Sequence, residues 1–109
     1  MSKRTDAELI DDIREAIRRV EDYTKAMNYE QFLRDTKVQD AVVRNLEIIG
    51  EAVKNLSPDF KKNRKDLDWK SIAGFRDRVI HHYFGVNWDI VWDVVRHKVP
   101  ELKAQLPQQ

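Results

Sequence analysis

Apolar residues recur every three or four positions along most of this 109-residue chain, and this spacing constrains the fold more than any other feature. The stripe over residues 36–56 consists of Val38, Val42, Leu46, Ile49, Val53 and Leu56. A charged fraction of 36%, with only three Gly and three Pro, favours helices as well. Since the alternation typical of strands is missing from the sequence, we predict amphipathic helices throughout.

Four main helices are predicted, over residues 6–27, 36–56, 69–84 and from 88 onward. Thr5 and Glu8 form a capping-box pattern at the start of the first helix. Caps are also predicted at Thr36, Asp68 and Asn87, with a loop over residues 61–68. Short helical turns are expected at residues 29–35 and near 59–60, and Pro100 either kinks the fourth helix or opens a final turn. The prediction is an all-α, up-and-down four-helix bundle with short extra helical turns, formed by a single domain over residues 1–109.

The net charge and the lack of certain residue types and segments exclude several classes of protein. Twenty basic and nineteen acidic residues leave a net charge of +1, so RNA would bind at a local patch of the surface. The chain has no Cys, which excludes disulfides and thiolate zinc sites. No apolar run approaches the roughly 18 residues of a membrane span, and the first residues lack a signal-peptide pattern. We therefore expect a cytoplasmic protein that needs no metal or cofactor.

Residues 75–83 carry the side chains best suited to chemistry. Arg76 can clamp a phosphate through two parallel hydrogen bonds, and His81 can exchange protons near neutral pH. Together they supply what RNA cleavage needs without a metal, and Tyr83 lies two positions further on. From spacing alone, the alternative is that these are surface or interface residues near a helix end.

The geometry of an unbroken helix gives specific expectations for this segment. At about 100° per residue, Arg76 and Tyr83 share one face, whereas His81 lies about 140° from Arg76. Asp77 is one turn before His81 and lies beneath it. A symmetric dimer paired through the third and fourth helices would bring two Arg-x4-His sets into one cleft.

Two further groups of side chains fit RNA binding and also have simpler explanations. Lys61, Lys62 and Arg64 precede the motif and can contact phosphates, although a solvated loop accounts for them equally well. The aromatic side chains Trp69, Trp88 and Trp92 can stack on bases, but at helical spacing we expect them to belong to the core. Asn45 falls on an apolar stripe, where it either bonds within the core or reaches the cleft.

Three segments together resemble the HEPN ribonucleases, specifically the HepT-like family. They are residues 44–52, residues 69–83 with their Arg-x4-His-x-Tyr spacing, and the Pro100-Glu101-Leu102 sequence near the end. The resemblance implies an all-helical HEPN domain that forms a homodimer, with the motifs of both subunits in one cleft. Assembly of these dimers into larger complexes is left open. It also implies a metal-independent endoribonuclease toxin whose partner is an MNT-type nucleotidyltransferase antitoxin. In that family the partner transfers AMP from ATP onto the motif tyrosine.

Carried over residue by residue, the resemblance makes Arg76 and His81 the catalytic pair. Tyr83 becomes the AMP acceptor and a residue that helps to position RNA. Asp77 holds the polar position after the arginine, often Asn in such motifs, and its negative charge is expected either to weaken RNA binding or to raise the pKa of His81. The alternative function is a non-catalytic helical binding module that docks with, or is modified by, a nucleotidyltransferase.

Overall fold

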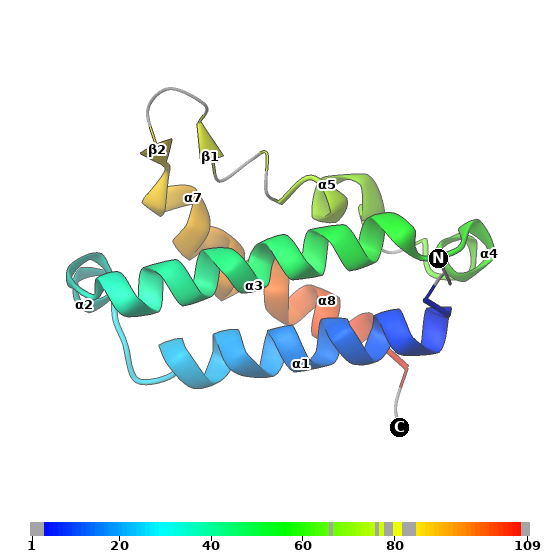
Figure 1. Cartoon of the computed structure of the whole chain (residues 1–109), viewed down its shortest axis with the longest axis horizontal. Coiled ribbons are helices and arrows are strands. Elements are labelled where there is room, and N and C mark those ends of the chain that lie inside the picture. The colour runs from blue at the N-terminus through cyan, green and yellow to red at the C-terminus, as the bar shows by residue number, and fades with distance from the viewer. Residues whose placement is uncertain (1–3, 66, 76, 78–79, 82–84, 108–109) are drawn as a thin grey trace.

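Two long antiparallel helices, α1 (Asp6–Thr24) and α3 (Thr36–Asn55), lie side by side at the centre of the computed structural model (Figure 1). The structure describes residues 4–65, 67–75, 77, 80–81 and 85–107, with the backbone alone for Ile80 and His81. The apolar stripes of the two helices face each other, and Ile13, Val20, Val42 and Leu46 are fully buried. This burial is the main stabilising contribution to the fold.

The starts of the helices follow the predicted capping chemistry closely. Thr5 and Glu8 form the reciprocal capping box at α1. Asp35 caps α3, one residue earlier than predicted, by accepting from the backbone N–H of Val38 at 3.0 Å. The short α2 (Tyr29–Arg34) lies between the two long helices in the sequence, and α4 (Pro58–Lys62) follows α3. The predicted loop at 61–68 therefore begins later than expected, because α4 includes Lys61 and Lys62.

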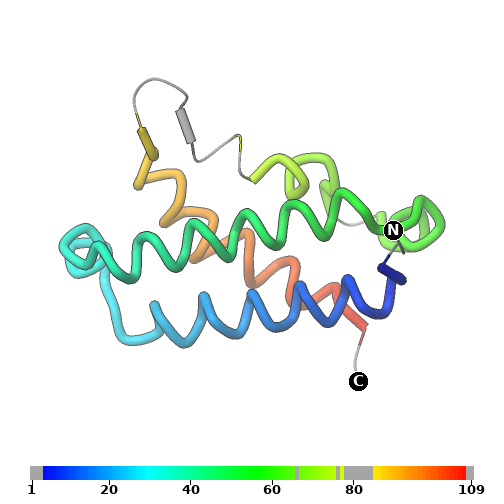
Figure 2. The backbone as a smooth tube through the Cα atoms, viewed as in Figure 1, coloured from blue at the N-terminus to red at the C-terminus, as the bar shows by residue number. Residues whose placement is uncertain are grey.

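Residues 88–105 form one helical run that packs against the long pair. It passes through α7 (Trp88–Asp93), the π-helix η1 (Val94–Lys98) and α8 (Val99–Gln105), as Figure 2 shows. The backbone N–H of Val99 donates to Val94, five residues earlier. Pro100 has no N–H for the carbonyl of Arg96, and the wider π turn lets the helix pass the proline. The chain thus neither breaks nor restarts at Pro100.

The all-α class is confirmed, but the third predicted helix is wrong beyond its first turns. Helix α5 (Trp69–Ala73) begins at the Asp68 cap as expected and ends at Gly74. Phe75 and Asp77 are again helical, and then Ile80–His81 form a strand, β1. This strand pairs antiparallel with β2 (Gly85–Val86), in the register Ile80 with Val86 and His81 with Gly85.

Gly85, the first residue of β2, has a backbone conformation that suits a hairpin. Its φ of +82° lies in the left-handed region that glycine adopts at little cost. The predicted left-handed conformation of Gly85 is confirmed, although it occurs in a hairpin and not at a helix end. Within the described ranges, no helix has both the length and the apolar character needed to cross a membrane.

Candidate nuclease site

Helix α5 carries the chain into the motif, and its position depends on a glycine of α3. A Cβ added at Gly50 would lie 3.1 Å from the carbonyl oxygen of Ala73 and 3.5 Å from that of Ile72. The C-terminal end of α5 therefore rests directly on the α3 backbone. A glycine at this point lets the segment before Arg76 approach the central helix more closely than any other residue would allow.

Three more contacts hold this entry segment in place. Ile72 and Phe75 are buried in the core, and Phe75 is 0% exposed. The indole Nε1 of Trp69 donates to the carbonyl oxygen of Arg64 at 2.8 Å. Phe60 packs edge-on against Trp69 with ring centroids 5.9 Å apart. Apolar burial and one indole hydrogen bond thus fix the chain immediately before the motif.

Of the predicted catalytic pair, the structure describes only the backbone of His81. That backbone lies in β1, where it pairs with Gly85, an exposed residue that has no side chain. Arg76 and Tyr83 lie outside the described residues. Asp77 is exposed.

The relations calculated for an unbroken helix do not hold. Because the chain changes from helix to strand before His81, Asp77 is not one helical turn beneath it. The separation of about 140° between Arg76 and His81 likewise depended on a continuous helix. The sequence pattern predicted the residues of interest but gave the wrong local backbone.

The three predicted cations near α4 occupy different environments. Lys62 is exposed, whereas Lys61 is half-buried and its Nζ donates to the carbonyl oxygen of Val53 at 3.4 Å. The guanidinium carbon of Arg64 lies 4.1 Å from the ring centroid of Phe60. Only Lys62 therefore has no partner among the contacts described, and Lys61 and Arg64 also support the fold.

The tryptophans contribute to the core, as expected. Trp88 and Trp92 are half-buried against Phe32, with ring centroids 5.8 and 5.0 Å away. Asn45 is also a core residue, because it is buried and its Nδ2 donates to the carbonyl oxygen of Ala41 at 2.8 Å. It does not reach a cleft through this bond.

Metal binding has no support in the described part of the chain. No group of three or more His, Asp or Glu side chains is placed there to hold an ion. His97 instead pairs with Asp93 on the same helix, with Nδ1 3.0 Å from Oδ1.

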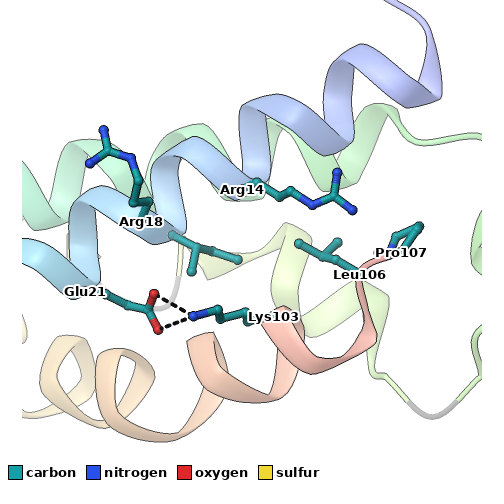
Figure 3. A pocket seen from close by; sticks show the side chains of 7 residues that line it. Arg14, Arg18, Glu21, Lys103, Leu106 and Pro107 are labelled. Carbon is teal, nitrogen blue, oxygen red and sulfur yellow. Dashed lines mark hydrogen bonds and ion pairs between the residues drawn. The ribbon is translucent and has the colours of Figure 1, made fainter. Parts of the chain in front are cut away.

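Two hollows of similar size lie on different sides of the molecule. One, of about 420 Å³, lies between α1 and α8 and is lined by Arg14, Arg18, Glu21 and Lys103, among others (Figure 3). Lys103 pairs with Glu21 at 3.0 Å across it, and Arg18 pairs with Glu15 and Asp22. Arg14 pairs with Asp11 at 3.5 Å, so the cations named here all have acidic partners, and α3 lies between α1 and the hairpin in Figure 1.

The second hollow adjoins the hairpin. Its volume is about 400 Å³, and Tyr29, Leu33, Gly85, Val86, Trp88 and Asp89 line it, together with Asn87. The hydroxyl of Tyr29 donates to Oδ1 of Asp89, sixty positions away in the sequence. This bond raises the pKa of the Tyr29 hydroxyl above its ordinary value. No spacing rule links Tyr29 with Asp89, so this hollow could not be predicted from the sequence.

Comparison with known proteins identifies the family of the whole fold. A family model described as "Ribonuclease HepT-like" matches residues 13–108. The chain is 44% identical over 103 residues to "Probable ribonuclease HepT" of Thermococcus cleftensis, a match that covers 94% of each protein. It is 51% identical over 89 residues to "Putative RNase MJ0127" of Methanocaldococcus jannaschii, covering 82% of this chain and 74% of that protein. No solved structure gives a significant match.

Proposed function

The chain belongs to the HepT-like family of ribonucleases, and on that premise we propose that Arg76 and His81 are the pair with which it cleaves RNA. The carrying observation is that the family match spans residues 13–108 and so includes both residues at the Arg-x4-His spacing. The position of His81 in a hairpin strand, paired with exposed Gly85, supports access for a polymer substrate.

The proposed reaction is transesterification within the RNA backbone. The 2′-oxygen attacks phosphorus while its proton moves to a base, and the bond from phosphorus to the 5′-oxygen breaks as that oxygen gains a proton. His81 moves one of these protons, an effect typically of about 10²–10⁴ in rate. Arg76 binds the scissile phosphate and stabilises the additional negative charge in the transition state. The products are a 2′,3′-cyclic phosphate and a 5′-hydroxyl, and the residues supply this chemistry without a metal.

The setting that we propose is a toxin–antitoxin pair acting in the cytoplasm. The partner is an MNT-type nucleotidyltransferase, and the hydroxyl of Tyr83 is the acceptor. The Tyr83 oxygen attacks the α-phosphorus of ATP, pyrophosphate leaves, and the phenolic proton passes to a base. AMP on Tyr83 adds bulk and negative charge beside the phosphate site, which repels RNA.

A homodimer paired through the segments around α5 and α7 completes the proposed site. It brings two Arg-x4-His sets to one cleft, where Lys61, Lys62 and Arg64 attract the RNA backbone. Asp77, next to Arg76, lowers the affinity for phosphate. The contrasting proposal, a non-catalytic module that docks with the nucleotidyltransferase, requires partner binding without any RNA cleavage.

Two substitutions with a matched control test the catalytic pair. Purified wild type, Arg76→Ala, His81→Ala and His97→Ala are incubated with total RNA, with and without EDTA. We expect cleavage by wild type and His97→Ala in both conditions, and loss of about 10²–10⁴ in rate for the other two at unchanged melting temperature. His97 is the matched histidine, because it is exposed and pairs only with Asp93 in the described contacts. Full activity of His81→Ala would refute the assignment.

The modification is tested separately. Wild type and Tyr83→Phe are mixed with an MNT-type nucleotidyltransferase and ATP, and their masses are measured. We expect addition of one or more AMP units to wild type alone, with loss of its RNA cleavage. Addition of AMP to Tyr83→Phe at the same level would place the acceptor elsewhere.

A further inference from the structure

The hollow beside the hairpin, which we call the base pocket, is lined by Tyr29, Leu33, Gly85, Val86, Trp88 and Asp89. Gly85 is the residue paired with His81 in the two-stranded ladder, where partner Cα atoms lie about 4.5–5.5 Å apart. The pocket mouth is therefore a near neighbour of the His81 backbone. A Cβ at Gly85 would meet nothing within 4 Å, so this edge of the pocket is open space.

The wall formed by α2 is fixed to the rest of the protein. The amide Nε2 of buried Gln39 donates to the carbonyl oxygens of Phe32 and Leu33, both at 3.1 Å. These bonds hold the C-terminal end of α2 on α3. Leu33 is 41% exposed and presents an apolar surface to the pocket.

The wall formed by α7 is joined to α2 through aromatic rings. Tyr29 packs against Trp92 with centroids 6.0 Å apart, and Trp88 meets Phe32 edge-on at 5.8 Å. The guanidinium of Arg96 lies over the Trp92 ring and donates to the carbonyl oxygen of Met27, just before α2. Both walls are thus held in place before a ligand arrives, which lowers the entropy lost on binding.

The chemistry of the lining fits a flat base better than a phosphate. Aromatic and aliphatic side chains, Tyr29, Trp88 and Leu33, suit the face of a base. Asp89 is the charged residue among those that line the pocket, and a carboxylate repels phosphate. Its two oxygens offer about four acceptor positions, of which the Tyr29 hydroxyl takes one. A partner for Asp89 must therefore present hydrogen-bond donors, and on a nucleobase these are N–H groups.

We propose that the base pocket binds a guanine of the RNA substrate, next to the linkage cleaved at His81. Guanine places two N–H donors, N1 and the 2-amino group, side by side on its Watson–Crick edge, which matches a carboxylate. Adenine and cytosine each offer a ring-nitrogen acceptor beside their amino group, and uracil places its single N–H between two carbonyls. The amide of Asn87, also in the lining, can donate to O6 of guanine. The inference rests on the proposed nuclease function, because it names the substrate of that same site.

Cleavage of matched RNAs tests the preference. Short single-stranded RNAs are made with one guanosine, and the same position is then changed to adenosine or to inosine, which lacks the 2-amino group. We expect wild type to cleave the guanosine RNA about ten-fold faster than the adenosine RNA, since a paired hydrogen-bond contact to a base edge discriminates against the wrong base. Inosine falls between them. In Asp89→Asn, the guanosine and adenosine rates converge to within about two-fold.

Asp93→Asn is the matched control, an acid-to-amide change on the same helix whose side chain pairs with His97. It should keep the full preference. Asp89→Asn can still accept from the Tyr29 hydroxyl, so its melting temperature should stay close to that of wild type. A second variant, Tyr29→Phe, keeps the ring but removes the hydroxyl that orients Asp89, and it should retain part of the preference.

A binding arm separates failure of the base pocket from failure of the nuclease proposal. The same oligonucleotides, with a 2′-deoxy sugar at the cleavage point, are titrated by fluorescence anisotropy. Cleavage with equal rates for guanosine and adenosine, or a preference unchanged in Asp89→Asn, overturns the base pocket and leaves the nuclease standing. No cleavage of any RNA, with guanine-selective binding lost in Asp89→Asn, overturns the nuclease and leaves the base pocket standing.

Discussion

The long helix pair and the motif side of this protein are built on different principles. Helices α1 and α3 contain 19 and 20 residues, and repeated apolar positions determine how they pack. The motif side, which we define as residues 69–93, includes, among its described residues, the five-residue α5, two strands of two residues each and the six-residue α7. Here a few contacts to α2 and α3 replace the repeated pattern. The residues assigned to chemistry thus belong to a segment whose position depends on individual supports.

The largest expected effect comes from removing the buried ring that anchors the motif side. Phe75 is 0% exposed and immediately precedes Arg76. Phe75→Ala should lower the free energy of unfolding by about 3–5 kcal/mol, because it removes buried apolar surface and also leaves a cavity in the core. Chemical denaturation measures the change, and RNA cleavage should fall with it. Tyr23→Ala, at a side chain 38% exposed on α1, should cost less than about 1 kcal/mol. Similar small losses for both variants would show that the motif side needs no such anchor.

A matched pair of glycines gives the next effect. In Gly50→Ala the new Cβ would lie 3.1 Å from the backbone oxygen of Ala73, and overpacking typically costs about 1–3 kcal/mol. Helix propensity returns about 1 kcal/mol, so we expect a net loss of up to about 2 kcal/mol and slower RNA cleavage. In Gly74→Ala the nearest oxygens, those of Lys70 and Ser71, are 3.5 and 3.6 Å away, an ordinary contact. That variant should retain stability within about 0.5 kcal/mol.

The sign of the stability change in Gly50→Ala distinguishes two roles for this glycine. A gain of about 1 kcal/mol in Gly50→Ala would mean that α5 moves aside freely and that propensity alone decides. The close approach of α5 to α3 would then not position the motif. Retained stability with slower cleavage would instead assign Gly50 mainly to positioning of the chain that leads to Arg76.

The contrast between the two regions also explains what the sequence could predict. Capping residues Thr5, Asp68 and Asn87 act within three positions of themselves, so their roles followed from local spacing. The stripe of α3 likewise repeats over five turns. Both signals are local and repeated, and both are confirmed.

The motif side was mispredicted because its signals compete. Ile72, Phe75, Val79 and Tyr83 have helical spacing, but residues 79–84 are also β-branched, aromatic or histidine, which suits a strand. Gly85, with its positive φ in β2, suits the hairpin that the chain adopts. The contact of Tyr29 with Asp89 joins residues 60 positions apart and depends on the tertiary fold, so no local pattern could reveal it.

A third prediction concerns the corner where α1 meets α4, in the region built from long helices. The carboxylate of Asp6 accepts from the backbone N–H of Ser57 at 2.9 Å and from its hydroxyl at 2.6 Å. These bonds lower the pKa of Asp6 below its ordinary value of 3.8. Hydrogen bonds to a charged group contribute about 1.5–3 kcal/mol, and partial exposure reduces this to about 1 kcal/mol. Asp6→Asn should cost that amount at pH 7.

The pH dependence of unfolding provides the matching measurement. Because the pKa of Asp6 is lower in the folded state, its contribution is complete above about pH 4 and is lost as the pH falls through the folded value. The difference in stability between wild type and Asp6→Asn should therefore shrink on acidification below pH 4. A difference that stays constant from pH 7 to pH 2 would show that the charge of Asp6 is not involved.

The smallest effect on the fold, and the sharpest separation of binding from stability, is expected at Lys62. This lysine is exposed at the end of α4, whereas Lys37 is an equally exposed lysine at the opposite end of α3 (Figure 1). Each alanine variant should change stability by less than about 0.5 kcal/mol. If Lys62 contacts one RNA phosphate, Lys62→Ala should reduce the slope of log affinity against log salt by about 0.7, the value per phosphate for a single strand. Lys37→Ala should leave the slope unchanged. Equal slopes in both variants would remove the α4 end from the RNA-binding surface, and the substrate would then have to be held by the motif side alone.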